Sequence, residues 1–306
     1  MDRREFIRRS ALAAFAAGPV ASIGSVTNLF ANTSRVNNSY DMVAVKGGEP
    51  DAMFDKAIES FGGMKSFVKK GQTVIVKPNI GWDTSPERAA NTNPKLVARV
   101  IKHCLNAGAK EVYVFDHTCD NWTKCYSNSG IEKAVKDAGG KIVSGANEGY
   151  YQNVEVKSGV NLNETKVHEL ILSSDVFINV PVLKSHGGGR ITVGMKNLMG
   201  IVWDRGYWHR NDLHQCIADF ATFKKPDLTI VDAYNVMMRN GPRGVSVNDL
   251  SPLKSLIISR DIVAADAAAA KIFGMEPDDV PYIKIADKMK VGTKDLSKLN
   301  IHRIKM

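Results

Sequence analysis

Several short stretches of this sequence combine residue types that can bind an anion or move a proton. Lys77 and Asn79 flank a proline, and a turn there would present an ammonium and an amide to an anionic ligand. Farther along, Asp116 directly precedes His117, and a carboxylate beside an imidazole can orient it for acid–base catalysis. Carboxylate and imidazole also ligate divalent metals, so both interpretations stay open here.

The third stretch is the richest. Lys184, His186, Arg190 and Lys196 surround the three consecutive glycines 187–189. Glycines permit close backbone approach, so their amides could line an anion site, and the cations would add charge around it. His186 could serve there as a metal ligand or a general base. The residues predicted to bind the ligand are Lys77, Asn79, Lys184, Gly187, Gly188, Gly189, Lys196 and Asn197.

Two further residues complete the candidate set. Asp232 follows an apolar run and could bind a metal or orient a base, and His214 opens a helical pattern that could point at the same pocket. His209 and His214 are five residues apart, which does not place them on one helical face as a zinc pair. The catalytic candidates are His186, Asp116 and His117, and the metal candidates are Asp116, His117, His186, His214 and Asp232.

The elements that must position these residues alternate along the chain. Short runs rich in Val and Ile alternate with helical patterns, which predicts an α/β fold with a mixed, mostly parallel sheet and helices on both faces. In such sheets ligands bind at the carboxyl ends of strands, where the polar stretches above fall. The predicted strands are Met42–Val45, Thr73–Lys77, Glu111–Phe115, Lys141–Val143, Val176–Val180, Leu228–Val231 and Leu256–Ser259.

Capping residues mark the helices. Asn93 and Pro94 begin a helix that runs to Asn106 and stops at Gly108. Polar residues between 148 and 167 indicate a surface hairpin. The other predicted helices are Ser129–Ala138, Asp212–Phe223 and Asp261–Phe273.

The N-terminal segment is predicted to be a targeting signal and not part of the folded domain. Arg3-Arg4-x-Phe6-Ile7 precedes a mildly apolar stretch and resembles a twin-arginine export signal, with cleavage after Ala31. The stretch is too glycine-laden for a permanent membrane span. We therefore expect a signal peptide at 1–31, a polar linker at 32–40, and one α/β domain, or two subdomains, at 41–306. The protein would use the twin-arginine machinery and reside in the periplasm or otherwise beyond the cytoplasmic membrane.

The charge distribution and the cysteine spacing limit the classes of ligand that the protein could bind. The 306 residues include 41 Lys and Arg against 32 Asp and Glu, a net charge of +9, but no basic block. This distribution argues against nucleic acid and allows an anionic small molecule. The four cysteines contain no Cys-x-x-Cys pair, so an iron–sulfur cluster is not supported. Cys119 and Cys125 could pair in an oxidising compartment, although spacing alone does not decide it.

One resemblance covers almost the whole mature chain. Leu183-Lys184-Ser185-His186, followed after a short stretch by the residues Met-Lys-Asn-Leu-Met-Gly at 195–200, resembles the pattern of the domain of unknown function 362 family. The match extends to Lys77-Pro78-Asn79, to Asp232 and to the helix from Asp261. The resemblance implies a mixed α/β fold and, for many members, a twin-arginine signal. It implies no particular reaction.

A weaker similarity exists to the N-terminal domain of the lactate racemase family. Those enzymes hold a nickel pincer nucleotide with an Asp-His-Thr-Arg turn and a His followed by a Gly-rich loop and a Lys. Asp116-His117-Thr118 and the pair of His186 and Lys196 are similar to that layout. Cys119 replaces the arginine and the spacing around Lys196 differs, which argues against the same cofactor.

These observations support an exported α/β protein that binds an anionic small molecule or cofactor, with or without a divalent metal, at the strand ends. Two classes stay open. An enzyme would hold one titratable group fixed by another. The alternative is a non-catalytic binding protein that serves a periplasmic redox system, which needs the cations but no such pair. The cofactor and the reaction stay unassigned.

Overall fold

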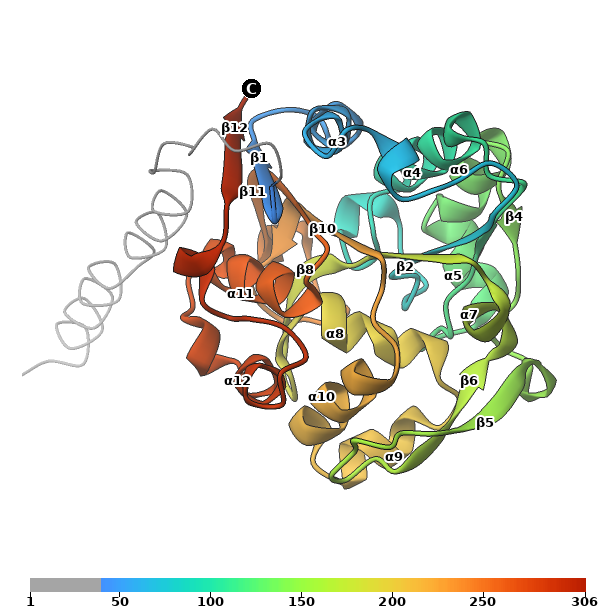
Figure 1. The fold of residues 1–306 in the computed structure, drawn as a ribbon, viewed down its shortest axis with the longest axis vertical. Helices are drawn as coiled ribbons and strands as arrows, with labels where there is room; N and C mark the ends of the chain where they lie inside the picture. Colours follow the sequence, from blue (N-terminus) through green and yellow to red (C-terminus); the bar gives the residue numbers. More distant parts are fainter. Residues whose placement is uncertain (1–39) are drawn as a thin grey trace, which may run out of the picture.

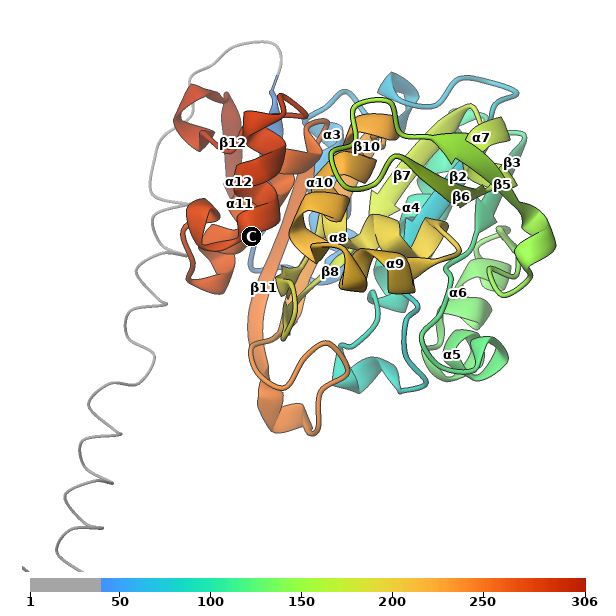
Figure 2. The same ribbon diagram turned by 90° about the horizontal axis from the view of Figure 1, so that it is seen from below.

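The structure is a computed structural model that describes residues 40–306. The expected signal peptide at 1–31 and nearly all of the expected linker lie outside the described residues. A ten-stranded sheet runs through the molecule, with a separate two-stranded hairpin beside it (Figures 1 and 2). The strands are β1 (Met42–Lys46), β2 (Thr73–Pro78), β3 (Glu111–Val114), β4 (Lys141–Ile142), β5 (Tyr151–Glu155), β6 (Glu164–His168), β7 (Val176–Val180), β8 (Val182–His186), β9 (Arg190–Thr192), β10 (Leu228–Met237), β11 (Leu250–Ser259) and β12 (Ile301–Lys305).

The sheet is mixed and mostly parallel, as predicted. Its order is β12-β1-β11-β10-β7-β2-β3-β4, and β8 pairs with β10 and β9. Pairing is antiparallel where β11 meets β1 and β10 and in the β8–β9 hairpin, and parallel elsewhere in this sheet. The carboxyl ends of β2 and β3 therefore lie side by side at the same end of the sheet, because the two strands are parallel.

Helices cover both faces of the sheet and enclose two apolar cores. Met53, Phe54 and Leu96 belong to the core on one face, and Trp208 and Phe220 to the core on the other. The continuous apolarity of the central strands follows from this double burial. The helices are α3 (Pro50–Glu59), α4 (Pro94–Ala107), α5 (Trp122–Asn128), α6 (Ile131–Asp137), α7 (Glu169–Ser173), α8 (Gly194–Asn197), α9 (Arg205–Arg210), α10 (Leu213–Phe223), α11 (Ile262–Phe273) and α12 (Pro281–Lys288).

The predicted caps place three helices correctly. The Asn93 side chain accepts a hydrogen bond from the backbone N–H of Lys95 and begins α4, and Gly108 ends it with a φ of 104°. The predictions for α10 and α11 are likewise confirmed to within one residue. The predicted helix 129–138 was wrong at its start, because Gly130, with a φ of 72°, separates α5 from α6.

The predicted strands are present, but two are longer than expected. β10 continues six residues past Val231 to Met237, and β11 starts at Leu250 instead of Leu256. The surface hairpin expected between residues 148 and 167 is β5–β6. Strands β8, β9 and β12 were not predicted, since the first two occupy the stretch interpreted as a glycine-rich loop.

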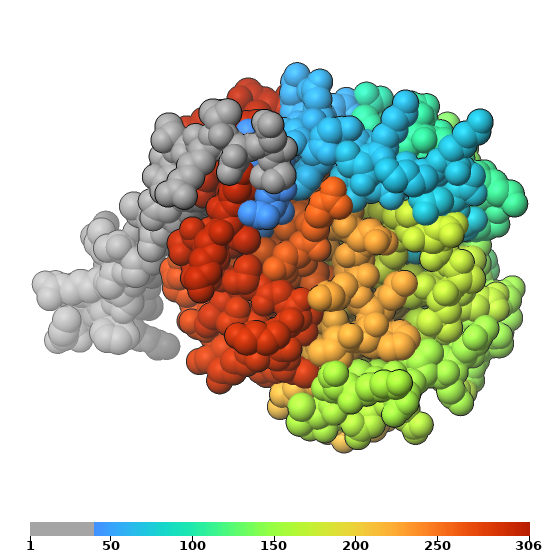
Figure 3. All heavy atoms as spheres, viewed as in Figure 1, coloured from blue at the N-terminus to red at the C-terminus, as the bar shows by residue number. Residues whose placement is uncertain are grey.

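The start and the end of the described chain lie side by side. β1 pairs with β11 on one side and with β12 on the other, and the blue and red ribbons meet there in Figure 1. In the space-filling view, blue atoms of the first described residues and red atoms of the last ones lie close together on this face (Figure 3). Within residues 40–306 no helix has the length and apolarity that a membrane crossing requires.

Candidate functional site

A small cavity of about 70 Å³ lies where the carboxyl ends of β2 and β3 meet β8 and the segment that follows β9. Its wall combines cations, amides and sulfur atoms. The lining residues are Lys77, Asn79, Gly81, Trp82, Asp116, His117, Cys119, Lys184, His186, Thr192, Lys196, Asn197, Met199, Gly200, Arg205 and Pro242.

The cavity gathers most of the predicted site residues from four separate stretches of sequence. Those that line it are Lys77, Asn79, Asp116, His117, Lys184, His186, Lys196 and Asn197. The predicted residues that do not line it are Gly187, Gly188, Gly189, His214 and Asp232.

An ion pair forms the floor of the site. Lys77 Nζ lies 2.9 Å from Asp116 Oδ1, and both side chains are almost completely buried. Asp116 Oδ2 accepts a hydrogen bond from the backbone N–H of Ile80 at 2.6 Å, which ties the end of β3 to the end of β2. Burial lowers the pKa of Lys77, and Asp116 opposes that shift. Removing either partner would leave the other charge buried and uncompensated.

Two asparagine side chains link the lysines. Asn79 Oδ1 accepts from Lys184 Nζ at 3.0 Å, and its Nδ2 donates to Asn197 Oδ1. Asn197 Oδ1 also accepts from Lys77 Nζ at 2.9 Å. These partners determine how each amide is oriented. Lys184 donates in addition to Ala90 O, and burial lowers its pKa to about 7.

The short helix α8 carries Lys196 and Asn197 and is held in place from behind. Asp266 of α11 accepts hydrogen bonds from the backbone N–H groups of Gly194 and Met195 at 2.7 and 3.0 Å. A Cβ at Gly194 would lie 2.6 Å from the Asp266 carboxylate, so only glycine allows this approach. Asp266 is thus a positioning residue that sequence reasoning missed.

Gly200 lies directly against the ion pair. A Cβ at this position would lie 1.8 Å from Asp116 Oδ1 and 2.5 Å from Lys77 Nζ. Its carbonyl accepts a hydrogen bond from the backbone N–H of His117 at 2.9 Å. The chain after α8 therefore closes over the Lys77–Asp116 pair, and this contact explains the glycine at the end of the Met-Lys-Asn-Leu-Met-Gly run.

The glycines 187–189 have a different role from the one predicted. They form the turn of the β8–β9 hairpin, and the N–H groups of Gly188 and Gly189 donate to His186 Nδ1 at 3.1 and 3.0 Å. His186 thus takes two of the three amide donors that the sequence suggested for an anion site, and none of the three glycines lines the cavity. A backbone N–H can only donate, so Nδ1 of His186 is an acceptor and the neutral ring carries its proton on Nε2.

The resulting tautomer makes a testable prediction. Burial, together with Lys196 and Lys184, lowers the pKa of His186 to about 3, so the ring should stay neutral with Nε2 protonated at every pH above about 5. Nitrogen NMR of the ¹⁵N-labelled protein should show this tautomer without titration up to about pH 8. A titration of His186 near its ordinary value would contradict the assignment. His302 lies half-buried on β12, does not border the cavity, and gives a second set of imidazole signals for comparison.

His117 adopts the opposite arrangement. Its Nδ1 donates to the carbonyl of Val202 at 3.0 Å, because a carbonyl can only accept, which leaves Nε2 as the acceptor in the neutral ring. The ring stacks on Trp203, with centroids 4.8 Å apart, and burial lowers its pKa. The cavity thus contains one imidazole with an N–H to donate and one with a lone pair to accept.

Arg205 was missed by sequence reasoning. It begins α9, and its guanidinium donates to the carbonyls of His117 and Thr118 at 2.8 and 2.7 Å, with Cys119 Sγ 3.5 Å away. Its neighbours in the sequence are mainly aromatic, and no local motif indicates that this arginine reaches the cavity. All four cysteines, which lie within the described residues, are free thiols, so Cys119 and Cys125 do not pair here.

The metal candidates are not arranged for a metal. Asp232 uses its oxygens for the backbone N–H groups of Asn93 and Tyr234, and His214 stacks on Tyr282. Both oxygens of Asp116 are engaged as well. Across residues 40–306, no three His, Cys, Asp or Glu side chains are grouped to hold an ion. These donors do not fit a divalent metal.

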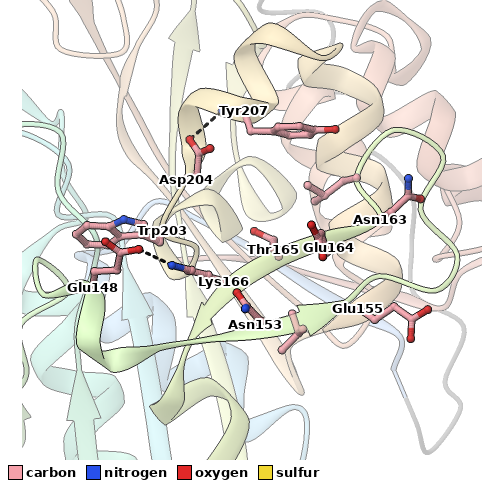
Figure 4. Close-up of a pocket in the computed structure, with 12 residues that line it drawn as sticks. Glu148, Asn153, Glu155, Asn163, Glu164, Thr165, Lys166, Trp203, Asp204 and Tyr207 are labelled. Atoms are coloured by element: carbon pink, nitrogen blue, oxygen red, sulfur yellow. Dashed lines mark hydrogen bonds and ion pairs between the residues drawn. The ribbon is translucent and has the colours of Figure 1, made fainter.

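A larger, open groove of about 1020 Å³ lies under the β5–β6 hairpin (Figure 4). Glu148, Glu164 and Asp204 border it, and the Glu148–Lys166 ion pair crosses one end. Trp203 lines this groove and stacks on His117, which lines the cavity, so the aromatic stack separates the two hollows. The groove contains none of the predicted site residues.

The cavity carries an excess of positive charge. Lys77, Lys184, Lys196 and Arg205 line it, and Asp116 is the single carboxylate among the residues around it. Burial of its ammonium lowers the pKa of Lys196 to about 8, and the nearby charges of Arg205 and Lys77 act in the same direction. An anion in the cavity would supply the missing charge.

Several known proteins are similar to this chain in sequence or in structure. The chain is 27% identical over 240 residues to a thylakoid-associated protein of Synechocystis sp., covering 76% of this chain and 72% of that one. The structure of the present chain is similar to that of the lactate racemase apoprotein of Thermoanaerobacterium thermosaccharolyticum, with a TM-score of 0.49 at 12% identity over 78% of this chain. The chain spans 58% of that protein's length. A protein of Thermotoga maritima is similar with a TM-score of 0.38 at 11% identity, and the match covers 56% of this chain and 48% of the Thermotoga chain.

The family model described as "Domain of unknown function (DUF362)" matches residues 74–271, which include every residue named above as lining the cavity. The resemblance found in the sequence between Leu183 and Gly200 is confirmed by this match. The chain belongs to the DUF362 family.

Proposed function

We propose that this protein binds a small anionic molecule in the cavity formed by Lys77, Lys184, Lys196 and Arg205, and that it is an enzyme acting on that molecule. One observation carries the proposal: within residues 40–306, three buried lysines and an arginine face one small cavity that a single carboxylate borders. A buried charge without a partner is costly, and a bound anion would offset that cost. The cavity's size limits the bound part of the ligand to a small group.

Sulfate is a suitable probe because it stays a dianion across the neutral range. At a concentration of about 100 times its dissociation constant it should raise the free energy of unfolding by about 2.7 kcal/mol, which thermal denaturation would report as a higher Tm. Sodium chloride at equal ionic strength should not do so. Calorimetry would give the affinity directly.

Matched lysine variants test the location. Lys196→Met should weaken sulfate binding at least tenfold, because it removes a buried cation from the cavity wall. Lys166→Met is the control, since Lys166 borders the open groove and pairs with Glu148. A wild-type protein that binds neither sulfate nor phosphate would refute the proposal.

We further propose that the protein is exported through the twin-arginine route, with residues 1–31 as its signal. The thylakoid association in the cyanobacterial relative's name is compatible with a place at or beyond a membrane. The double variant Arg3→Lys, Arg4→Lys should retain the protein in the cytoplasm, as cell fractionation would show. Arg8→Lys, Arg9→Lys is the matched control and should still be exported, with Asn32 as the new N-terminus. Equal export of both variants would contradict the assignment.

A further inference from the structure

We propose that Lys196 is a nucleophilic amine that captures a small oxo-carboxylate in the cavity as an imine. This inference rests on the proposed anion binding and names the class of substrate. The three cavity lysines differ in their hydrogen-bond partners. Lys77 donates to Asn197 Oδ1 and pairs with Asp116, and Lys184 donates to Asn79 Oδ1 and Ala90 O.

Lys196 has no such oxygen partner among residues 40–306. The contact that the structure gives its Nζ within the described residues is the thioether sulfur of Met199 at 3.0 Å, a weak acceptor. The residue is only 8% exposed and lines the cavity. A thioether compensates little of the cost of burying an ammonium, so a larger fraction of Lys196 than of an exposed lysine is the neutral amine, with a free lone pair. The pKa of Lys196, lowered to about 8, agrees with this reasoning.

The remaining groups suit an oxo-carboxylate. Lys184 and Arg205 can hold the carboxylate, and Lys77 contributes charge from the floor of the site. His186 presents a neutral Nε2–H that can donate to the carbonyl oxygen, because the amides of Gly188 and Gly189 occupy its Nδ1. His117, with Nε2 as an acceptor, can take up and return a proton.

The step balances without a co-reactant. The Lys196 nitrogen forms a bond to the carbonyl carbon, and a proton moves from nitrogen to the carbonyl oxygen to give a carbinolamine. The carbon–oxygen bond then breaks, the oxygen leaves as water with both amine protons, and a carbon–nitrogen double bond remains. Nothing is oxidised or reduced. Once its nitrogen takes up a proton, the imine would withdraw electrons from the neighbouring carbon, which activates that carbon for proton loss or carbon–carbon cleavage.

Reductive trapping tests the proposal on the full chain. The protein is incubated with pyruvate and sodium cyanoborohydride, and the modified peptides are mapped by mass spectrometry. We expect a reduced pyruvate adduct on Lys196, and not on Lys184 or Lys77. Propionate, which has the carboxylate but no carbonyl, should give no adduct, and sulfate should protect Lys196 by occupying the cavity.

Variants sharpen the result. Lys196→Arg should abolish the mapped adduct, whereas Lys102→Arg, which changes an exposed lysine of α4, should leave it intact. An adduct on Lys184, or sulfate binding without any adduct, would overturn the nucleophile assignment while the proposed function stands. Absence of both sulfate binding and adduct would refute the two together.

Discussion

The affinity of the cavity for sulfate should fall on the order of a hundredfold or more between about pH 6 and about pH 9. Burial lowers the pKa of Lys184 to about 7 and that of Lys196 to about 8 in the ligand-free protein. Both ammonium groups are therefore charged at the lower pH and largely neutral at the higher one. A bound dianion favours the charged forms, so binding above these pKa values requires proton uptake and becomes weaker as the pH rises.

Calorimetry at a series of pH values measures this dependence, and the protons taken up on binding can be counted by repeating it in buffers of different ionisation enthalpy. His186 should not contribute between these limits, because burial lowers its pKa to about 3. The Lys166→Met variant should give the same profile as the wild type. An affinity that does not change with pH would mean that Lys184 and Lys196 do not contact the anion.

The second large effect concerns stability. Asp116→Ala should lower the free energy of unfolding by about 3–5 kcal/mol, because it leaves the Lys77 ammonium buried without its partner. It also removes the acceptor of the Ile80 N–H group. Adding Lys77→Met to the same chain should recover part of the loss, since the uncompensated charge is then gone. Urea denaturation of the two single variants and the double variant measures the coupling.

An exposed ion pair provides the contrast. Lys133 and Asp137 form a pair one helical turn apart on α6, and their side chains are 81% and 62% exposed. Asp137→Ala should leave the denaturation midpoint nearly unchanged, because water already solvates both charges. If Asp116→Ala were as harmless as Asp137→Ala, the buried pair would not be the structural floor of the cavity.

Local sequence signals predicted the elements well where one residue type determines the backbone. Asn93 and Gly108 delimit α4, and the Val-rich run at 176–180 is a central strand, because capping and double burial act through neighbouring residues. The position of Lys77 and Asp116 at adjacent strand ends followed from the parallel sheet alone. That reasoning gathered thirteen predicted residues in one pocket, and eight of them line the cavity.

The sequence analysis missed site residues where contacts between residues distant in the sequence determine which side chains reach the cavity. Arg205 reaches the cavity through backbone carbonyls of residues 117 and 118, and Asp266 supports α8 from another helix. Neither contact leaves a local pattern. The three glycines suggested an anion site, but a tight hairpin uses the same residues, and only the register of β8 against β9 reveals that His186 takes their amides.

The place of β1 between β11 and β12 has a consequence for biosynthesis. β1 is made first among the described strands, yet one of its two edges stays unpaired until β12 has been translated. Until β12 has been made, the growing chain therefore exposes an unfilled strand edge, which is a template for wrong pairing and a natural binding site for chaperones. Pairing of β12 fills that edge, so docking of this strand would be the step that ends the exposure of β1.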